Sequence, residues 1–454
     1  MKIILAGGGK VGKTLADQLS SENYDITVID DDPAVIESAV ESFDVMAVKG
    51  NCASMNVLRQ AGAMTADLLI AATGTDEVNL LSCMTAHALN PKLHTIARIC
   101  NPEYNHQAYA MRDTFGLSLT FNPDKQAAEE IVRLLKLPGF LKRETFAKGR
   151  VEIVEIRIDE DSPLCNIALS DISGIVKCKI LICTVLRDGR AISPAGNFIL
   201  EKDDRIFVTA TTDNLALLLK NIGIVTHKNK NVTIVGGGKI GYYLAESLEN
   251  SSISAQIIEM DEERCKELAA SLPHTNIIHG NGGFRETLES EGVPHTDALI
   301  SLTGMDEVNM VISLYGDRFG VPQSITKLDR IDDSKVVARL PLGSIICPKR
   351  LCCSNILRYV RAMQNQAGAA TTIHTIADGL AEAIEFPVDG TTLHCGEPLR
   401  KFKLKQNIRL VSITKRNGVI EIPSGDSFFE KGDSVVIVSS RKEVILHLND
   451  IFAE

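Results

Sequence analysis

The fold is decided by the stretch Gly7-Gly8-Gly9-Lys10-Val11-Gly12, which directly follows the apolar run at residues 1–6. Residues 10–20 then have helical periodicity, and residues 26–29 form a second short apolar run rich in β-formers. A strand, a tight glycine turn, a helix and another strand therefore follow one another. This order predicts a βαβ unit with parallel strands and a right-handed connection.

Each glycine of the turn has its own physical role. Gly7 permits the tight turn, Gly9 lets the backbone approach a pyrophosphate, and Gly12 allows the helix to lie close to the strand. The N-terminus of the helix attracts phosphates. Asp30 ends the second strand, where its carboxylate can accept hydrogen bonds from a ribose and would repel a 2′-phosphate. The pattern predicts a dinucleotide site that favours NAD over NADP, and the alternative is a glycine turn with a surface acid.

The same pattern recurs 229 residues later as Gly236-Gly237-Gly238-Lys239-Ile240-Gly241, with Glu259 in the place of Asp30. Residues 73–79 recur at 303–309, and Gly189 recurs at Gly418. This period is far longer than the roughly 20–50 residues of a solenoid repeat, so each copy holds at least one complete domain. Finding the whole signature twice argues against a chance glycine turn.

Alternating strands and helices predict an α/β fold, with a doubly wound Rossmann-like parallel sheet followed by a small α+β domain in each copy. Strands are expected at 1–6, 26–29, 45–48, 68–72 and 94–98. In the small domain, Val151–Ile158 alternates like an exposed strand, and Asp188-Gly189 predicts a hairpin turn. The predicted domains are a first Rossmann domain at 1–124, a linker helix at 125–140, an α+β domain at 141–225, a second Rossmann domain at 231–348, a linker helix at 349–366 and a second α+β domain at 370–454.

Two further features lie at the carboxyl edge of the predicted sheet, where open parallel sheets bind ligands. Thr73-Gly74-Thr75-Asp76-Glu77 follows the fourth strand and either covers a cofactor or caps the next helix through Thr75 or Asp76. Arg98 ends the fifth strand and either reaches a phosphate or pairs with an acidic neighbour. Its counterpart Lys327 lacks the bidentate fork of a guanidinium, so an arginine-specific role is not expected in the second copy.

Charge and hydropathy exclude several classes of protein. A formal net charge of −10 argues against a general affinity for nucleic acid, which needs a basic surface. No apolar run approaches the roughly 18–20 residues that span a bilayer. The sequence starts in a strand without signal-peptide architecture, so we expect a cytoplasmic protein that reaches a membrane only through a partner.

The chain shows no catalytic or metal-binding pattern. Its eleven cysteines include no CxxC pair, and its ten histidines are scattered, which favours reduced cysteines and no metal site. His87, His94 and Cys100 are catalytic candidates by residue type alone, and none has a histidine or cysteine counterpart in the second copy. We therefore expect a protein that is not an enzyme.

The chain resembles the family of tandem RCK (KTN) N-domain and TrkA C-domain proteins, which are peripheral cytoplasmic subunits of Trk-type potassium uptake. The resemblance rests on residues 2–12 with Asp30, on residues 50–53 and 72–79, and on their second-copy counterparts, and it covers essentially all 454 residues. It implies binding of NAD (NAD+ or NADH), binding of ATP or ADP at related sites, and assembly into a homo-oligomeric dimer or tetramer ring. It also implies a membrane-embedded potassium-translocating partner of Trk type, which would hold the chain at the inner face of the cell membrane.

The expected cofactor-binding residues combine the glycine signature with the motifs of the family. They are Gly7, Gly8, Gly9, Lys10, Val11, Gly12, Asp30, Asn51, Cys52, Thr73, Gly74 and Arg98 in the first copy, and Gly236, Gly237, Gly238, Lys239, Ile240, Gly241, Glu259, Asn281, Thr303 and Gly304 in the second. Because Gly282-Gly283 replaces Cys52-Ala53 and Glu259 replaces Asp30, the second site is expected to differ in affinity or in nucleotide preference.

The function expected from this pattern is regulatory. Nucleotide occupancy would shift the angle between domains and bias a membrane channel or transporter between its open and closed states, which requires different affinities for the two states. One alternative is an NAD-dependent dehydrogenase with an unrecognised catalytic site. Another is a soluble nucleotide sensor without a membrane partner.

Overall fold

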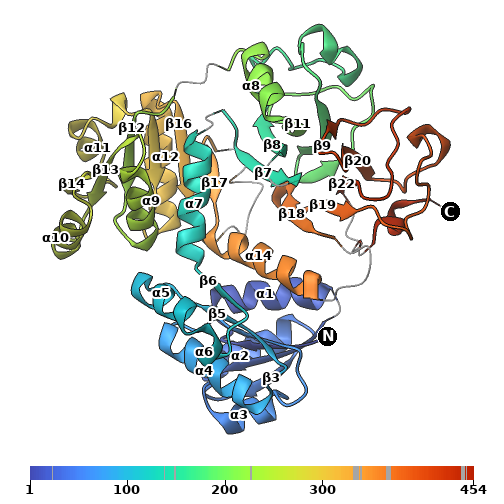
Figure 1. Cartoon of the computed structure of the whole chain (residues 1–454). Helices are drawn as coiled ribbons and strands as arrows, with labels where there is room; N and C mark the ends of the chain where they lie inside the picture. Colours follow the sequence, from blue (N-terminus) through green and yellow to red (C-terminus); the bar gives the residue numbers. More distant parts are fainter. Residues whose placement is uncertain are drawn as a thin grey trace. The chain divides into compact units, whose positions relative to one another are not determined.

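The computed structural model describes residues 1–22, 24–136, 139–147, 150–224, 228–330, 337, 340–363, 370–440, 445 and 447–453. The remaining positions of the predicted domains, among them 137–138 and 364–366 of the two linker helices, lie outside the described residues. The chain forms two compact units (Figure 1): unit one holds Met1–Ala127 with Cys347–Leu357, and unit two holds Ala128–Ile346 with Arg358–Glu454.

Unit one is built on a parallel sheet with the strand order β3-β2-β1-β4-β5-β6. This order confirms the predicted doubly wound sheet, and β6 is an additional strand that the sequence pattern did not predict. The strands are β1 Lys2–Ala6, β2 Asp25–Asp30, β3 Met46–Lys49, β4 Leu68–Ala71, β5 His94–Arg98 and β6 Leu119–Phe121. The helices are α1 Lys10–Ser21, α2 Pro33–Ser42, α3 Met55–Gln60, α4 Asp76–Leu89, α5 Pro102–Ala110 and α6 Arg112–Phe115.

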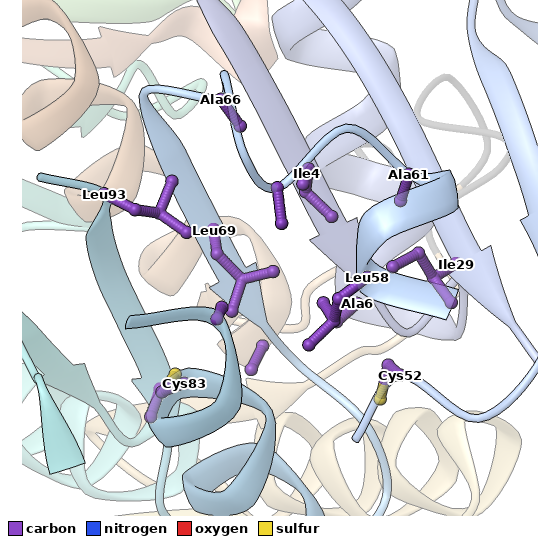
Figure 2. Close-up of a cluster of buried hydrophobic side chains, with 14 of the residues drawn as sticks. Ile4, Ala6, Ile29, Cys52, Leu58, Ala61, Ala66, Leu69, Cys83 and Leu93 are labelled. Atoms are coloured by element: carbon purple, nitrogen blue, oxygen red, sulfur yellow. The ribbon is translucent and has the colours of Figure 1, made fainter. Parts of the chain in front are cut away.

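The central strands of this sheet are buried on both faces, as expected for parallel strands covered by helices. Ile3, Ile4 and Leu5 of β1 are each 1% exposed. Figure 2 shows the cluster on one face, in which Leu69 and Leu58 lie among buried side chains from β1, β2, α3 and α4. This core fixes the carboxyl ends of the strands, where the glycine turn begins.

Unit two contains a second parallel sheet with the order β14-β13-β12-β15-β16-β17, which repeats the first. Its strands are β12 Asn231–Val235, β13 Ser254–Glu259, β14 Asn276–His279, β15 Ala298–Ser301, β16 Gln323–Lys327 and β17 Ser344–Ile346. Its helices are α9 Lys239–Glu249, α10 Glu262–Ser271, α11 Arg285–Ser290, the short 3-10 helix η3 Val293–His295, and α12 Asp306–Phe319. The tandem duplication of the Rossmann-like sheet is therefore confirmed.

The helix after each parallel sheet is divided between the two units. Helix α7, Pro123–Lys136, belongs to unit two from Ala128 onward, where the Leu134 and Leu135 carbonyls accept hydrogen bonds from Gln323 and Asn229. Helix α14, Pro348–Met363, contributes its first part to unit one, where the Cys353 thiol donates to the Val11 carbonyl at 3.8 Å. Each copy of the repeat thus supplies a helical segment to the unit that holds the other parallel sheet.

Two antiparallel five-stranded sheets complete unit two, with the orders β10-β9-β11-β8-β7 and β18-β19-β22-β20-β21. The predicted hairpin is confirmed: Arg190 of β10 pairs with Arg187 of β9, and Asp188 and Gly189 both have positive φ, at 51° and 70°. The first small domain has β7 Lys142–Phe146, β8 Val151–Arg157, η2 Leu169–Gly174, β9 Leu181–Arg187, β10 Arg190–Ile192, β11 Arg205–Thr211 and α8 Thr212–Asn221. The second has β18 Thr372–Ile376, η4 Ala377–Gly379, β19 Ala381–Pro387, η5 Leu399–Lys401, β20 Ile408–Thr414, β21 Ile420–Glu421, β22 Ser434–Ser439 and η6 Leu448–Ile451.

The two small domains share one hydrophobic core. Phe146, Cys183 and Phe207 of the first pack with Val411 and Val436 of the second, among other buried residues. This arrangement corrects the expectation that Val151–Ile158 forms an exposed strand, because β8 is buried on both faces.

The polar positions of β8 explain the alternation that suggested exposure. The Glu152 carboxylate is buried and pairs with Arg143, and Glu155 is buried and pairs with Arg205. The alternating pattern therefore comes from buried ion pairs and not from a solvated face.

Within the described residues, no helix combines the length and apolar character needed to cross a bilayer.

Candidate nucleotide-binding sites

Backbone conformation and neighbouring backbone atoms require glycine at two positions of the first loop. Gly7 has φ +102°, and a Cβ there would lie 2.9 Å from both the carbonyl carbon of Ala72 and the backbone nitrogen of Thr73. A Cβ on Gly12 would lie 1.9 Å from the Gly7 carbonyl oxygen. The turn between β1 and α1 therefore closes only with glycine at these two positions, and the second copy repeats the arrangement at Gly236 and Gly241.

The third glycine has no such requirement. Gly9 is the N-cap of α1 with φ −63°, and a Cβ there would meet no atom within 4 Å. Gly238, the N-cap of α9, has the same open surroundings. Because glycine has no side chain, neither N-cap residue makes a side-chain capping bond, and space stays open beside each helix N-terminus where a Cβ would lie. The helix dipole favours an anion at such an N-terminus.

The acidic residues at the strand ends are tied to the glycine loops. Asp30 accepts from the Gly8 backbone N–H at 2.7 Å and from the Asp32 N–H at 3.0 Å. Glu259 repeats both bonds, with the Gly237 N–H at 2.6 Å and the Asp261 N–H at 2.9 Å. Because an ionised carboxylate has about four acceptor positions, each can still accept from a ribose hydroxyl.

The loop after the fourth strand is held by a residue that the sequence reasoning missed. Asn79 is fully buried; its Oδ1 accepts from the Thr73 backbone N–H at 2.8 Å, and its Nδ2 donates to the Arg98 carbonyl at 3.0 Å. Asn309 makes the same two bonds with Thr303 and Lys327. The available signal was the asparagine that ends the repeated motifs 73–79 and 303–309.

Asp76 takes a third role besides the two considered from sequence. Its carboxylate accepts from the backbone N–H groups of Cys100 and Asn101, at 2.9 and 2.7 Å. Thr75 is the N-cap of α4 but makes no side-chain capping bond. Asp76 therefore joins the loops after β4 and β5, and Asp306 joins the corresponding loops of the second copy.

The two cations at this edge occupy equivalent places. An Arg98 Nη1 lies 3.5 Å from the Thr73 carbonyl oxygen, and Lys327 Nζ lies 3.2 Å from the carbonyl oxygen of Thr303. Arg98 Nε also donates to the Cys100 sulfur, whereas Lys327 pairs with Asp329 at 3.2 Å. Both cations thus lie beside the loop after the fourth strand of their sheet.

Of the remaining predicted cofactor-binding residues, some lie in loops or first helical turns, and Cys52 lies in the core. The side chains of Asn51 and Asn281 accept from the backbone N–H two residues later and shape their turns. The Cys52 thiol lies in the buried core cluster of Figure 2, where burial raises its pKa and Ser82 donates to it. Gly74 and Gly304 have open space where a Cβ would lie, and Lys10, Val11, Lys239 and Ile240 form the first turns of their helices.

Of the catalytic candidates named by residue type, Cys100 lies beside Arg98 at the carboxyl edge of the first sheet, whereas His87 lies in the last turn of α4 and His94 at the start of β5. His94 begins β5, at the edge of the sheet opposite the glycine turn, and its Nδ1 lies 3.3 Å from the Ser118 hydroxyl. Across the described part of the chain, no group of three or more His, Cys, Asp or Glu side chains is placed to hold a metal ion.

Two Rossmann-like domains, each with a glycine loop and an acidic strand end and each followed by a small antiparallel domain, define a tandem protein of the RCK class. The sequence model of the TrkA-N domain matches residues 3–116 and 232–348, and that of the TrkA-C domain matches residues 153–223. The chain therefore belongs to the TrkA family.

Curated relatives match over the full length. The Trk system potassium uptake protein TrkA of Haemophilus influenzae is 31% identical over 100% of this chain and 98% of its own. A TrkA homolog of Archaeoglobus fulgidus is 30% identical over 98% of each. Among solved structures, the GsuK RCK domain aligns with a TM-score of 0.60 at 17% identity, covering 96% of this chain and 92% of that one. The GsuK channel bound to NAD aligns with a TM-score of 0.59 at 16% identity, covering 96% of this chain and 76% of that one. These two structures share the fold.

Proposed function

We propose that the chain is a regulatory subunit that binds NAD+ or NADH at its two glycine loops and thereby controls a membrane-embedded potassium-translocating subunit of Trk type. The observation that carries this proposal is the open space at Gly9 and Gly238. Neither the backbone conformation nor a neighbouring atom requires glycine there, whereas a pyrophosphate approaching the helix N-terminus would.

The neighbouring carboxylates support a dinucleotide as the ligand. A pyrophosphate at the α1 N-terminus places the adenosine ribose toward Asp30, which is already fixed by the Gly8 N–H. In the second copy Glu259 is fixed in the same way by Gly237. A carboxylate at this position favours free ribose hydroxyls over a 2′-phosphate, and hence NAD over NADP.

The regulatory part of the proposal rests on the family. The full-length relatives are named as Trk potassium uptake proteins, and control of a transporter requires a ligand that binds its two states with different affinity. We extend this to the present chain: ATP or ADP competes at the same loops, two or four chains form a ring, and the ring lies at the inner face of the cell membrane on its partner.

The binding step can be tested with Gly9→Asp and Gly238→Asp in the full chain. Each aspartate enters open space and supplies an N-cap side chain that α1 and α9 lack, so the fold is retained. Its carboxylate fills the phosphate position and repels the ligand. We expect calorimetric titration to show two NAD+ per chain for the unaltered protein, one for each variant and none for the double variant.

Gly174→Asp is the matched control, because a Cβ there also meets no atom within 4 Å but lies in the first small domain. It should leave the stoichiometry at two. Unchanged NAD+ binding by the double variant would contradict the proposal.

The transport step can be tested by growth at low potassium. Cells that lack this protein and other uptake routes should grow poorly, and the unaltered chain should restore growth. The double variant should restore it less well. Normal growth of the cells without the protein would overturn the assignment to potassium uptake.

A further inference from the structure

Three large apolar side chains are exposed around the second glycine loop. Met260, Phe284 and Met305 are 69%, 60% and 59% exposed. Met260 follows the last residue of β13, Phe284 is the N-cap of α11 after β14, and Met305 is the N-cap of α12 after β15. All three therefore lie at the carboxyl edge of the second parallel sheet, where the proposed nucleotide site lies.

The first copy has polar residues at the same three positions. By the repeat offsets of 229 and 230, Asp31 corresponds to Met260, Ser54 to Phe284, and Thr75 to Met305. An exposed group of large apolar side chains is typical of a contact with a ligand or a partner. The duplicated backbone is thus the same at both sites, and the surface beside it differs.

The contacts of the second glycine loop place it between the two segments that carry Met260 and Met305. The Gly237 N–H donates to the Glu259 carboxylate. A Cβ on Gly236 would lie 3.0 Å from the backbone nitrogen of Thr303. The glycine loop therefore lies between the end of β13 and the loop after β15. Met260 is the next residue after Glu259, and Met305 is two residues after Thr303.

Charge at this edge also differs between the copies. Arg264 of α10 donates from Nε to the Gly237 carbonyl at 2.9 Å, whereas its counterpart Val35 lies against Gly8. The strand end of the first copy carries Asp30, Asp31 and Asp32, and Val35 supplies no charge at the position of Arg264. Arg264 thus places a guanidinium beside the second loop, where it also pairs with Glu267 at 2.8 Å.

We propose that the second site is anchored on the adenine base: Met260 and Met305 lie against its two faces, so this site binds ADP nearly as well as NAD+, whereas the first site needs the whole dinucleotide. Thioether sulfur and methylene groups make favourable contacts with aromatic rings. The inference rests on the proposed function, because it assumes that both loops bind nucleotides.

The two sites can be measured separately in the full chain. Gly9→Asp leaves only the second site and Gly238→Asp leaves only the first. By calorimetric titration, we expect the Kd values of the second site for ADP and NAD+ to agree within a few-fold. We expect the first site to bind ADP at least about tenfold more weakly than NAD+.

Exchanging the surface residues tests the methionines directly. In the Gly9→Asp background, Met260→Asp with Met305→Thr should weaken ADP binding roughly tenfold, as expected for the loss of two sulfur–aromatic contacts. In the Gly238→Asp background, Asp31→Met with Thr75→Met should strengthen it. Val311→Thr is the control, because Val311 is also an exposed apolar residue, 43% exposed, but lies inside α12. It should leave ADP affinity unchanged.

The outcomes separate this inference from the proposed function. If the unaltered chain binds neither NAD+ nor ADP, the proposed function fails. If it binds both and the exchanges leave ADP affinity unchanged, only the adenine anchor is overturned. If the exchanges change the oligomeric state in size-exclusion chromatography and not ADP affinity, the apolar residues form a contact between chains and the anchor is likewise overturned.

Discussion

The two Rossmann-like domains have the same strand order, but their cores differ beneath the fourth and fifth strands. The first domain has Ala71, Cys83 and Ala97 there, and the second has Ser301, Ser313 and Thr326 at the matching positions. All six side chains are fully buried. A shared fold therefore keeps these residues small but does not fix their polarity.

The hydroxyl groups are tolerated because they satisfy one another. Ser301 and Ser313 lie 3.0 Å apart, Ser313 and Thr326 lie 2.6 Å apart, and Thr326 donates to the Leu342 carbonyl at 2.6 Å. In the first domain, the Cys83 thiol donates only weakly to the Ile96 carbonyl at 3.8 Å, and burial raises its pKa to about 12. Buried polar groups cost little when each one has a partner, and much when a partner is lost.

The two small domains also contribute different charged side chains to the boundary between them. At their shared boundary the first supplies Lys142 and Glu144, and the second supplies His374. Lys142 donates to the Thr375 carbonyl at 2.8 Å, and Glu144 lies 2.6 Å from His374 Nδ1. The duplicated strands thus meet through unlike partners, which favours pairing of the first small domain with the second over pairing of two identical ones.

The largest expected effect comes from the closest contact that the two glycine loops share. Gly12→Ala places a Cβ 1.9 Å from a carbonyl oxygen, and Gly241→Ala places one 2.3 Å from the corresponding oxygen. We expect a loss of about 4 kcal/mol in the free energy of unfolding of the first domain, above the usual ~1–3 kcal/mol for overpacking, and a smaller loss in the second. Calorimetric unfolding measures the loss of stability in each variant. Hydrogen exchange of the β1 and β12 amides assigns that loss to the first or the second domain. Gly9→Ala is the control, and an equal loss there would contradict this interpretation.

The second effect tests the one-sided boundary of the small domains. Burial alone would raise the pKa of Glu144, but Lys142 and His374 together lower it from 4.5 to about 2. A lowered pKa means that the pair stabilises the fold fully above about pH 4.5 and that this stability is lost as the pH falls toward 2. We expect Glu144→Gln to remove on the order of 3 kcal/mol at neutral pH and to flatten the acid dependence of the free energy of unfolding.

The matched control for this change is Glu160→Gln, since Glu160 pairs with Lys202 on the exposed surface. Its pairing is screened by solvent, so little change is expected. Urea unfolding between pH 2 and 7 compares the two variants, and the same acid dependence in both would rule out the boundary pair as its source.

The smallest effect compares the two cores directly. Ser313→Ala removes the hydroxyl between Ser301 and Thr326 and should cost about 2 kcal/mol, because both neighbours lose a partner. Cys83→Ala in the first domain should cost about 1 kcal/mol, since it removes one sulfur atom and a weak hydrogen bond. Hydrogen exchange of the β15 and β4 amides reports each domain separately. A greater loss for Cys83→Ala would show that the network contributes less than its geometry indicates.

The sequence was sufficient to predict the doubled parallel sheet, the following small domains and the glycine turns, because periodicity and glycine spacing are local signals. It did not predict β6, since three residues, Leu119–Phe121, are too few to show a period. It also misjudged β8, because Glu152 and Glu155 have the pattern of a solvated face and their arginine partners cannot be located from spacing alone.

The site was predicted less completely than the fold. From sequence, Asn79 was only the last residue of the repeated motif 73–79, and its two partners in space, Thr73 and Arg98, reveal that it holds two loops together. Cys52 belonged to a family motif, but its thiol is part of the core. The division of α7 and α14 between the units was equally hidden, because an amphipathic helix shows that it has a buried face but not which domain covers that face.

That division of helices constrains how the chain is made. Unit one includes residues 347–357, so a ribosome that has finished residue 127 must still translate residues 128–346 before this segment exists. At ordinary elongation rates of about 5–20 residues per second, the interval lasts roughly 10–45 s. During this time the Val11 carbonyl lacks its contact with Cys353. The domain that is translated first is therefore completed only near the end of synthesis.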